Sequence, residues 1–436
     1  MSDELYRLLT LQDWNTRIAL AGTGLLGAAS GVIGSLAVLR RRALMGDALA
    51  HAALPGLWAA FFVMRERHFA GLLLGAALAG TLGVLIVVAL RRYTRIKEDA
   101  AIGIVLSVFF GAGMCLSRIL QSAGIGNTAG LDSFIFGKAA SMLGEDVRAI
   151  ATVAAVVIGC VVLFYKEFRL LCFDREFAGA LGWPVLLLDV WLMALLVLCT
   201  VIGLPAVGVV LMAALLITPA AAARFWTDRL SWMIVLAAIF GALSGLIGSG
   251  LSALYTHLST GPAVVLAAAS FFTISMLFAP RRGVVTDAFK RWQLRRKIGL
   301  QNLLRTMFEL SERRRGGRPT YRLEEIEGGR AWTRQIAHLQ LARAAREGLV
   351  YEALDGYGLT PAGREAAERV VRAHRLWEMF LVEHASIAPD HVDRDADQIE
   401  HILPPELLRE LEEKLQAEGR LPAVPQSPHV LGESAV

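Results

Sequence analysis

The chain has 436 residues, 55% of them hydrophobic, and a formal net charge of +5 at pH 7. Its mean hydropathy of +0.51 lies well above that of soluble globular proteins and excludes that class for the chain as a whole. The four cysteines form no CxxC pair, which argues against a disulfide framework and a thiolate metal site.

Apolar residues are concentrated between about residue 14 and residue 279, and the chain beyond Pro280 is rich in Arg and Glu. This predicts a polytopic membrane domain followed by a soluble domain. The N-terminal stretch MSDELYRLLTLQDWN lacks the features of a cleavable signal peptide. Nine runs are long enough to cross all or most of a bilayer, which predicts an all-α bundle of about nine helices: 14–39, 46–64, 69–90, 101–118, 148–164, 185–202, 204–223, 231–250 and 262–279.

Basic residues are unevenly divided among the segments that join these spans. Alternate segments, among them 40–45, 91–100 and 165–184, carry most of the Arg and Lys. The positive-inside rule then places the N-terminus outside and the C-terminal domain in the cytoplasm. Such loops also account for the net positive charge, so that nucleic-acid binding is not needed to explain it.

Small residues recur within the spans, as in GLLLGAALAGTLG (71–83) and GALSGLIGSG (241–250). Because small residues let helix backbones approach closely, these stretches predict a tightly packed bundle. Prolines interrupt several apolar runs, and broken helices are common in transporters: Pro55, Pro205, Pro219 and Pro262.

The stretch RRRALMGDALAHAALPGLW (40–58) places ionisable residues at the head of an apolar span. Asp47 and His51 are four residues apart, so they share one face of a helix. A carboxylate and an imidazole together suit a first-row divalent cation. The alternative is that Asp47 caps the helix or pairs with the arginines of 40–42 while His51 bonds a neighbouring helix. The two residues alone leave both interpretations open.

The segment MGDALAHAALPG (45–56) resembles the GDALSHAVLPG signature of the metal-ion permeases of ABC importers for manganese, zinc and iron. Other segments are similar to that family in order, covering about residues 14–282: 97–116, 131–138, 165–184, 207–224 and 259–269. The resemblance implies a type II ABC importer-like fold in a bacterial plasma membrane. It makes Asp47 and His51 ligands of the metal in the translocation path, lined by two permease copies or by the chain and a paralogue.

The segment YKEFRLLCFDREFAGALGWP (165–184) resembles the cytoplasmic coupling segment of the same family. The resemblance implies a docking helix for the ATPase subunit, with these contact residues: Phe168, Phe173, Asp174, Glu176 and Gly182. The chain itself contains no GxxxxGK[ST] motif, so we expect a transport subunit and not an enzyme. A separate ATPase would supply the power, and an extracytoplasmic binding protein would deliver the metal.

Beyond the last span, the run RRGVVTDAFKRWQLRRKIGL is basic, which suits contact with anionic lipid or marks the inner face of the membrane. It precedes a predicted amphipathic helix at 301–312 and a second helix over 331–350 that runs into a short strand. The stretch YEALDGYGLT (351–360) predicts a β-wing, and a long helix follows with Thr360 as its N-cap. This order of elements is typical of a winged helix-turn-helix.

The tail from 348 to 411 resembles the iron- and manganese-dependent repressor family, in LTPAGREAAERVVRAHRLWEMFLVE and in DADQIEHILPPEL. By residue matching, six side chains fall on metal-ligand positions of that family: His374, Glu378, Asp393, Asp397, Glu400 and His401. Where the first helix of the family supplies further ligands, this chain has Asn302 and Arg305, neither of which suits a cation. A retained but silent domain is therefore the alternative to a metal sensor. DNA binding is not favoured, because a membrane tether makes an operator search awkward.

The expected domains are a permease at 1–282, a basic juxtamembrane linker at 283–298, a winged-helix-like domain at 299–359, a helical metalloregulator-like segment at 360–415, and a disordered tail at 416–436. We expect no permanently bound cofactor, with manganese, zinc or iron as the transported ion and also as a regulatory ligand if the tail senses metal. Two other interpretations stay open. One is a membrane-anchored metal-responsive transcriptional regulator, and the other is an importer of a metal chelate or a cobalamin-like cofactor.

Overall fold

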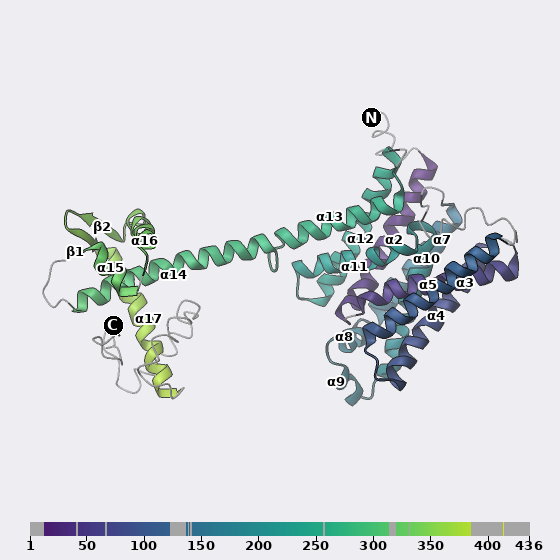
Figure 1. Cartoon of the computed structure of the whole chain (residues 1–436), viewed down its shortest axis with the longest axis horizontal. Helices are drawn as coiled ribbons and strands as arrows, with labels where there is room; N and C mark the ends of the chain where they lie inside the picture. Colours follow the sequence, from purple (N-terminus) through teal and green to yellow (C-terminus); the bar gives the residue numbers. More distant parts are fainter. Residues whose placement is uncertain are drawn as a thin grey trace. The chain divides into compact units, whose positions relative to one another are not determined.

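The computed structural model describes residues 13–40, 42–65, 68–122, 137, 139, 142–255, 258–313, 320–330, 332–384 and 413. The chain divides into two compact units, Met1–Asp287 and Ala288–Val436, called here the membrane unit and the C-terminal unit. Figure 1 shows that both units are built mainly from helices and that the only strands drawn lie in the C-terminal unit.

The membrane unit contains eight described helices that are long and apolar enough to cross a bilayer. A further apolar helix, α11, is shorter. These nine correspond in order to the nine predicted spans: α2 (Trp14–Leu39), α3 (Ala43–Met64), α4 (Phe69–Tyr93), α5 (Glu98–Ser122), α7 (Gly144–Leu163), α10 (Val185–Val207), α11 (Val209–Trp226), α12 (Leu230–Leu254) and α13 (Thr260–Phe278). Two short helices, α8 (Tyr165–Phe173) and α9 (Arg175–Ala180), follow α7. The polytopic all-α prediction is confirmed.

The break between α10 and α11 differs from the prediction. The sequence placed it at residue 203, but α10 continues through Pro205 to Val207. Proline is tolerated there because it removes only one hydrogen bond near the end of the helix. The chain turns at Gly208, whose φ of 90° is readily available only to glycine. As a result α11 has only 18 residues, with its own proline at position 219.

Close packing between α2 and α12 confirms the role predicted for the small residues. A Cβ atom added at Gly27 would lie 2.1 Å from the carbonyl oxygen of Gly241, and one added at Gly241 would lie 2.0 Å from the carbonyl oxygen of Gly27. One turn away, the Thr23 and Ser249 hydroxyls are 2.7 Å apart. Backbones therefore touch directly along this interface, as membrane helices with small residues do.

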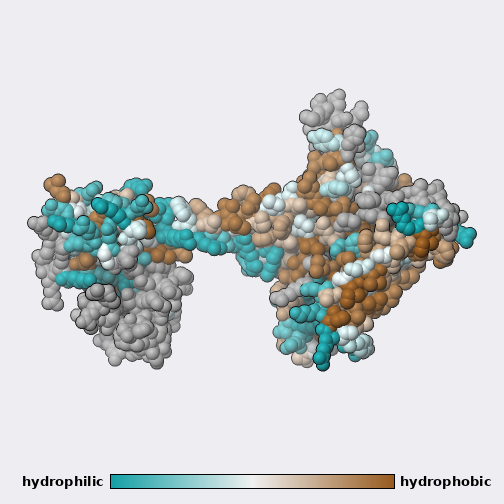
Figure 2. Space-filling model, in the orientation of Figure 1, coloured by the Kyte–Doolittle hydropathy of each residue, from teal (hydrophilic) through white to brown (hydrophobic). Residues whose placement is uncertain are grey.

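Large apolar side chains cover the outside of the membrane unit, as Figure 2 shows in brown. On α4 they recur at helical spacing and stay more than half exposed: Leu74, Leu78, Leu82 and Leu85. Such a continuous apolar face is unfavourable in water and matches the hydrocarbon of a membrane.

The C-terminal unit has a small three-stranded sheet packed with helices. The strands β1 (Thr320–Tyr321), β2 (Val350–Ala353) and β3 (Gly356–Leu359) are antiparallel in the order β1-β3-β2. The β2–β3 hairpin, in which Val350 pairs with Leu359, confirms the predicted wing. The core beneath it includes Leu303, Met307, Tyr321, Ile326 and Leu341.

The helices of this unit are α14 (Val284–Arg313), α15 (Leu323–Arg330), α16 (Arg334–Arg346) and α17 (Pro361–His384). Thr360 accepts a hydrogen bond from the Gly363 N–H at 3.0 Å, which confirms it as the N-cap of α17. The basic run expected to be a linker is helical and belongs to α14. The helix predicted over 331–350 is shorter, and α15 was not predicted because LEEIEGGR holds two glycines and little apolar periodicity.

Candidate functional site

The helix that carries Asp47 and His51 is held on several sides by close contacts. A Cβ atom at Gly56 of α3 would lie 2.1 Å from the carbonyl oxygen of Gly75 on α4. On the α5 side, a Cβ atom at Gly113 would lie 2.8 Å from Cβ of Leu54. Most side chains of α3 from Met45 to Phe61 are buried. The position of α3 is therefore fixed by its neighbours, and its two ionisable side chains are placed by the bundle.

Asp47 and His51 lie on one face of α3, as the spacing predicted. His51 Nε2 is 3.4 Å from Asp47 Oδ1, and the side chains are 13% and 34% exposed, respectively. That distance is longer than a strong N–H···O hydrogen bond, so the two groups face each other without closing tightly. A divalent cation between them would need each donor within about 2.0–2.2 Å of the ion, which a small rotamer change on one helix face can provide.

The surroundings of His51 leave one of its nitrogens unused. Its ring meets the edge of Phe110 from α5, with the centroids 4.9 Å apart. Its Nδ1 atom is buried and has no hydrogen-bond partner among the described residues. A buried imidazole without a full set of partners is costly, and a metal or proton that uses the ring reduces that cost.

The pair supplies only part of a coordination shell. Within the described ranges, no cluster of three or more His, Cys, Asp or Glu side chains is arranged to hold a metal ion. First-row divalent ions take four to six donors, so Asp47 and His51 need water or ligands from another chain to complete the shell. An incomplete shell binds an ion loosely enough to release it, which a transport path requires.

The predicted coupling segment forms α8 and α9. Asp174 ends α8 and accepts a hydrogen bond from the Phe177 N–H at 2.9 Å, so it caps α9. Gly182 lies in the turn before α10 with a φ of 80°. Of the five expected contact residues, Phe173, Asp174, Glu176 and Gly182 are exposed. Phe168 is fully buried and anchors α8 to the bundle, so its side chain does not lie on the docking surface expected for it.

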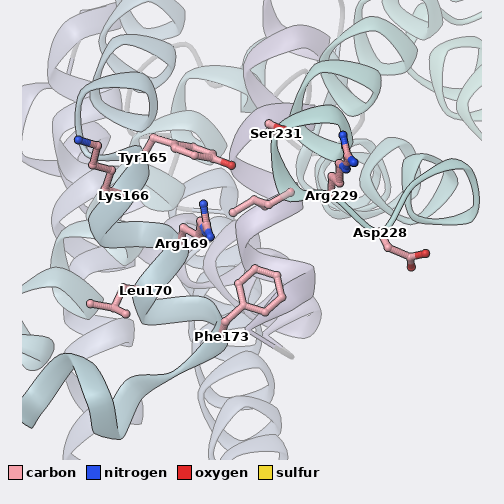
Figure 3. A pocket seen from close by; sticks show the side chains of 9 residues that line it. Tyr165, Lys166, Arg169, Leu170, Phe173, Asp228, Arg229 and Ser231 are labelled. Atoms are coloured by element: carbon pink, nitrogen blue, oxygen red, sulfur yellow. The ribbon is translucent and has the colours of Figure 1, made fainter.

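A pocket of about 800 Å³ opens beside α8. In Figure 3, Tyr165, Arg169 and Phe173 approach it from α8, and the segment that joins α11 to α12 lies opposite. Three of its lining side chains are cationic: Lys166, Arg169 and Arg229. The remaining lining residues are Tyr165, Leu170, Phe173, Asp228, Leu230 and Ser231.

The acidic member of this pocket is already paired. Arg281 donates to Asp228 at 3.0 Å and Arg282 donates to it at 2.6 Å. The hydrogen bond from Arg281 is the main reason that the pKa of the Asp228 carboxyl lies below its usual range. With this carboxylate compensated, the pocket beside α8 presents positive charge and aromatic surface.

In the C-terminal unit, His374 lies in a cation-rich setting. The Arg305 guanidinium donates from Nη1 to His374 Nδ1 at 3.0 Å, and both side chains are almost fully buried. Arg305 also pairs with Glu309 at 2.6 Å. A guanidinium neither ligates nor attracts a metal, so the described residues around His374 do not fit a metal ion in this arrangement. Glu378 lies one turn further along α17, and four predicted ligands fall outside the described residues: Asp393, Asp397, Glu400 and His401.

Two family models match the chain. Residues 12–279 match the ABC 3 transport family. Residues 360–426 match the metal-binding and dimerisation domain of iron-dependent repressors. The first match covers the helices of the membrane unit, and the second begins at the N-cap of α17.

Relatives with assigned names extend this likeness along the whole chain. The manganese transport system membrane protein MntC of Bacillus subtilis is 40% identical over 422 residues, which cover 97% of this chain and 96% of that protein. The zinc transport system membrane protein TroC of Treponema pallidum is 43% identical over 66% of this chain and 96% of its own length. A chain of PsaBC from Streptococcus pneumoniae, solved in complex with a Fab, is 31% identical with a TM-score of 0.57, over 64% of this chain and 97% of its own.

Proposed function

The chain belongs to the ABC 3 transport family, and from this premise we propose that it is the permease subunit of an importer for a divalent transition metal, with manganese as the first choice and zinc or iron next. The relatives named for manganese and zinc transport support this choice of cargo. Carboxylate and imidazole accept all three ions, so the donors do not select among them by type.

The observation that carries the proposal is the Asp47–His51 pair inside the bundle. Ionisable side chains within a membrane span are costly and are usually retained for a pathway or a ligand. The two donors share one helix face, and His51 keeps a buried nitrogen without a described partner. As an ion gives up water on entering the path, this carboxylate and this imidazole replace part of its hydration shell.

Three partners follow from this role. An ATPase subunit docks on the exposed surface of α8 and α9, where Phe173, Asp174 and Glu176 are accessible. An extracytoplasmic binding protein delivers the ion. A second permease copy, or a paralogue, completes the pathway and adds donors to the shell. In this arrangement the protein spans a bacterial plasma membrane with its N-terminus outside and its C-terminal unit in the cytoplasm.

The C-terminal unit would act as a regulatory or dimerisation module of the permease. Its match to a repressor metal-binding and dimerisation domain supports this role, while the Arg305–His374 contact argues against metal at His374. Truncation after Arg282 should leave transport active and remove any response to internal metal. Identical responses of the truncated and full-length proteins would refute the sensing role.

The proposal is tested by cellular metal content, measured by mass spectrometry in an importer-deficient bacterial host. The chain is expressed with its ATPase and its binding protein, and wild type is compared with His51→Gln and with the control His338→Gln at matched membrane abundance. His338 lies on α16 in the C-terminal unit, away from the spans. We expect one metal to accumulate in wild type and the control and to stay at background in His51→Gln.

Two other outcomes would favour other functions. No accumulation of a free ion, together with uptake of a metal chelate or cobalamin, would favour the chelate importer. No accumulation of either, together with metal-dependent changes in transcription that require the chain, would favour the anchored regulator.

A further inference from the structure

Buried charges gather where α3 begins. Arg40 and Arg42, which flank the start of this helix, each place a guanidinium nitrogen 2.9 Å from the same atom, Asp189 Oδ1 of α10. Arg42 also pairs with Glu98 of α5 at 2.6 Å, and Arg91 of α4 pairs with the other oxygen of Glu98 at 3.0 Å. Arg42 and Asp189 are only 3% and 5% exposed. These five residues are called here the charge network.

The charge network reaches the coupling segment. Arg40 Nη1 donates to the carbonyl oxygen of Leu171 on α8 at 2.9 Å. Leu171 is itself fully buried, so this end of α8 is fixed against the bundle. Arg40 therefore contacts α8 and α10 together, and Arg42 contacts α10 and α5 from the N-cap position of α3. The shared Asp189 oxygen connects the two arginines.

Stability alone does not account for such a network. Taking several charges out of water costs free energy that the ion pairs recover only in part, and apolar residues of similar size often serve stability as well. A buried network does fix one arrangement of the elements that it joins. Here these elements are the proposed ATPase-docking helix and the helix that carries Asp47, about 7.5 Å along the axis from Arg42.

We propose that Asp189 is a positioning residue that couples movement of α8 to the metal-binding helix α3. In this relay, displacement of α8 by the ATPase moves Arg40 through the Leu171 carbonyl. The shared carboxylate passes the displacement to Arg42 and so to the start of α3. Asp189 contacts neither the metal nor ATP. The inference rests on the proposed function, because it assigns α8 to the ATPase and α3 to the metal.

The test uses the complete importer in proteoliposomes, with the ATPase, the metal-loaded binding protein and manganese as the ion. Asp189→Asn keeps the side-chain volume and removes the charge that both arginines share. Arg40→Gln is the second variant, since it removes the link to α8 while Arg42 keeps Asp189 and Glu98. Asp146→Asn is the control, because Asp146 caps α7 through the Leu143 N–H and lies outside the charge network.

If the relay exists, Asp189→Asn and Arg40→Gln assemble and keep basal ATP hydrolysis. The stimulation of hydrolysis by the loaded binding protein, and the manganese moved per ATP, fall by about tenfold, the factor that the loss of one charge-assisted hydrogen bond corresponds to. The control keeps wild-type values. Wild-type stimulation and stoichiometry in both variants would overturn the relay.

Thiol labelling separates a relay from a merely structural role. Cys172 on α8 and a cysteine introduced by Leu44→Cys at the start of α3 are labelled with and without ATP, and the labelling is quantified by peptide mass spectrometry. In the Leu44→Cys background alone, ATP changes the labelling at both sites. With Asp189→Asn or Arg40→Gln added, it still changes Cys172 but no longer changes position 44. Loss of both changes, or persistence of both, would contradict the relay, while absence of manganese transport in wild type would instead refute the proposed function.

Discussion

The packing of α2 against α12 makes a quantitative prediction for Gly27→Ala. Ordinary van der Waals contact begins at 3.4 Å, and a Cβ atom at Gly27 would lie 2.1 Å from the backbone oxygen of Gly241. The obstacle is backbone, so no side chain can rotate away. The two helices must separate by about an ångström, which spoils the contact between Thr23 and Ser249 one turn further along.

The expected cost is that of overpacking a close-packed interface, about 1–3 kcal/mol. Gly159→Ala on α7 is the matched control, because a Cβ atom there meets nothing within 4 Å. Both variants gain the same helix propensity, about 1 kcal/mol, so the difference between them isolates the clash. Gly27→Ala should therefore be less stable than Gly159→Ala by about 1–3 kcal/mol.

The assay uses Cys199, which is fully buried on α10, and whose sulfur lies 3.6 Å from the Ser30 hydroxyl of α2. A maleimide can reach this thiol only when the membrane unit opens, and peptide mass spectrometry distinguishes it from the other cysteines. Labelling is followed in detergent micelles at increasing SDS concentration. The midpoint should fall for Gly27→Ala relative to Gly159→Ala. Equal midpoints would refute the inference that the backbones touch.

Two further predictions concern other parts of the chain. Thr360→Ala removes the cap of α17, worth about 1 kcal/mol, so hydrogen exchange in its first turn should quicken about fivefold in the full chain; unchanged exchange would show that the cap is not formed. Burial raises the pKa of the Cys172 thiol to about 12. Because the thiolate is the reacting form, alkylation of Cys172 by iodoacetamide should keep rising with pH between 9 and 11, and a plateau near pH 9 would contradict this burial.

The parts of the fold that depend on local pattern could be predicted from the sequence. Long apolar runs gave the membrane helices, and Thr360 with Pro361 marked the start of α17. The i, i+4 spacing placed Asp47 and His51 on one face, because that relation depends only on helix geometry. The end of α10 was misplaced because a proline near the end of a helix is tolerated, whereas Gly208 is the residue at which the chain turns.

The charge network could not be predicted from local pattern. Asp189 and Arg40 are separated by 149 positions, and a lone aspartate within an apolar run does not indicate its partners. The sequence did raise a pairing between Asp47 and the arginines of 40–42 as one alternative, whereas the structure directs Arg40 and Arg42 to Asp189 and Glu98. Asp47 is thereby left facing His51. For the same reason the sequence could not show that Phe168 faces inward, since burial depends on elements that pack from elsewhere in the chain.

The most direct test of metal transport is ATP-driven uptake of manganese into proteoliposomes that contain the purified permease and its ATPase, with the loaded binding protein added outside. Wild type is compared with Asp47→Asn, which keeps the side-chain size and removes the negative charge that faces the ion. We expect uptake by wild type and none above background by Asp47→Asn, with equal amounts of assembled complex. Equal uptake by the two would contradict the assignment of the Asp47–His51 pair to the metal path.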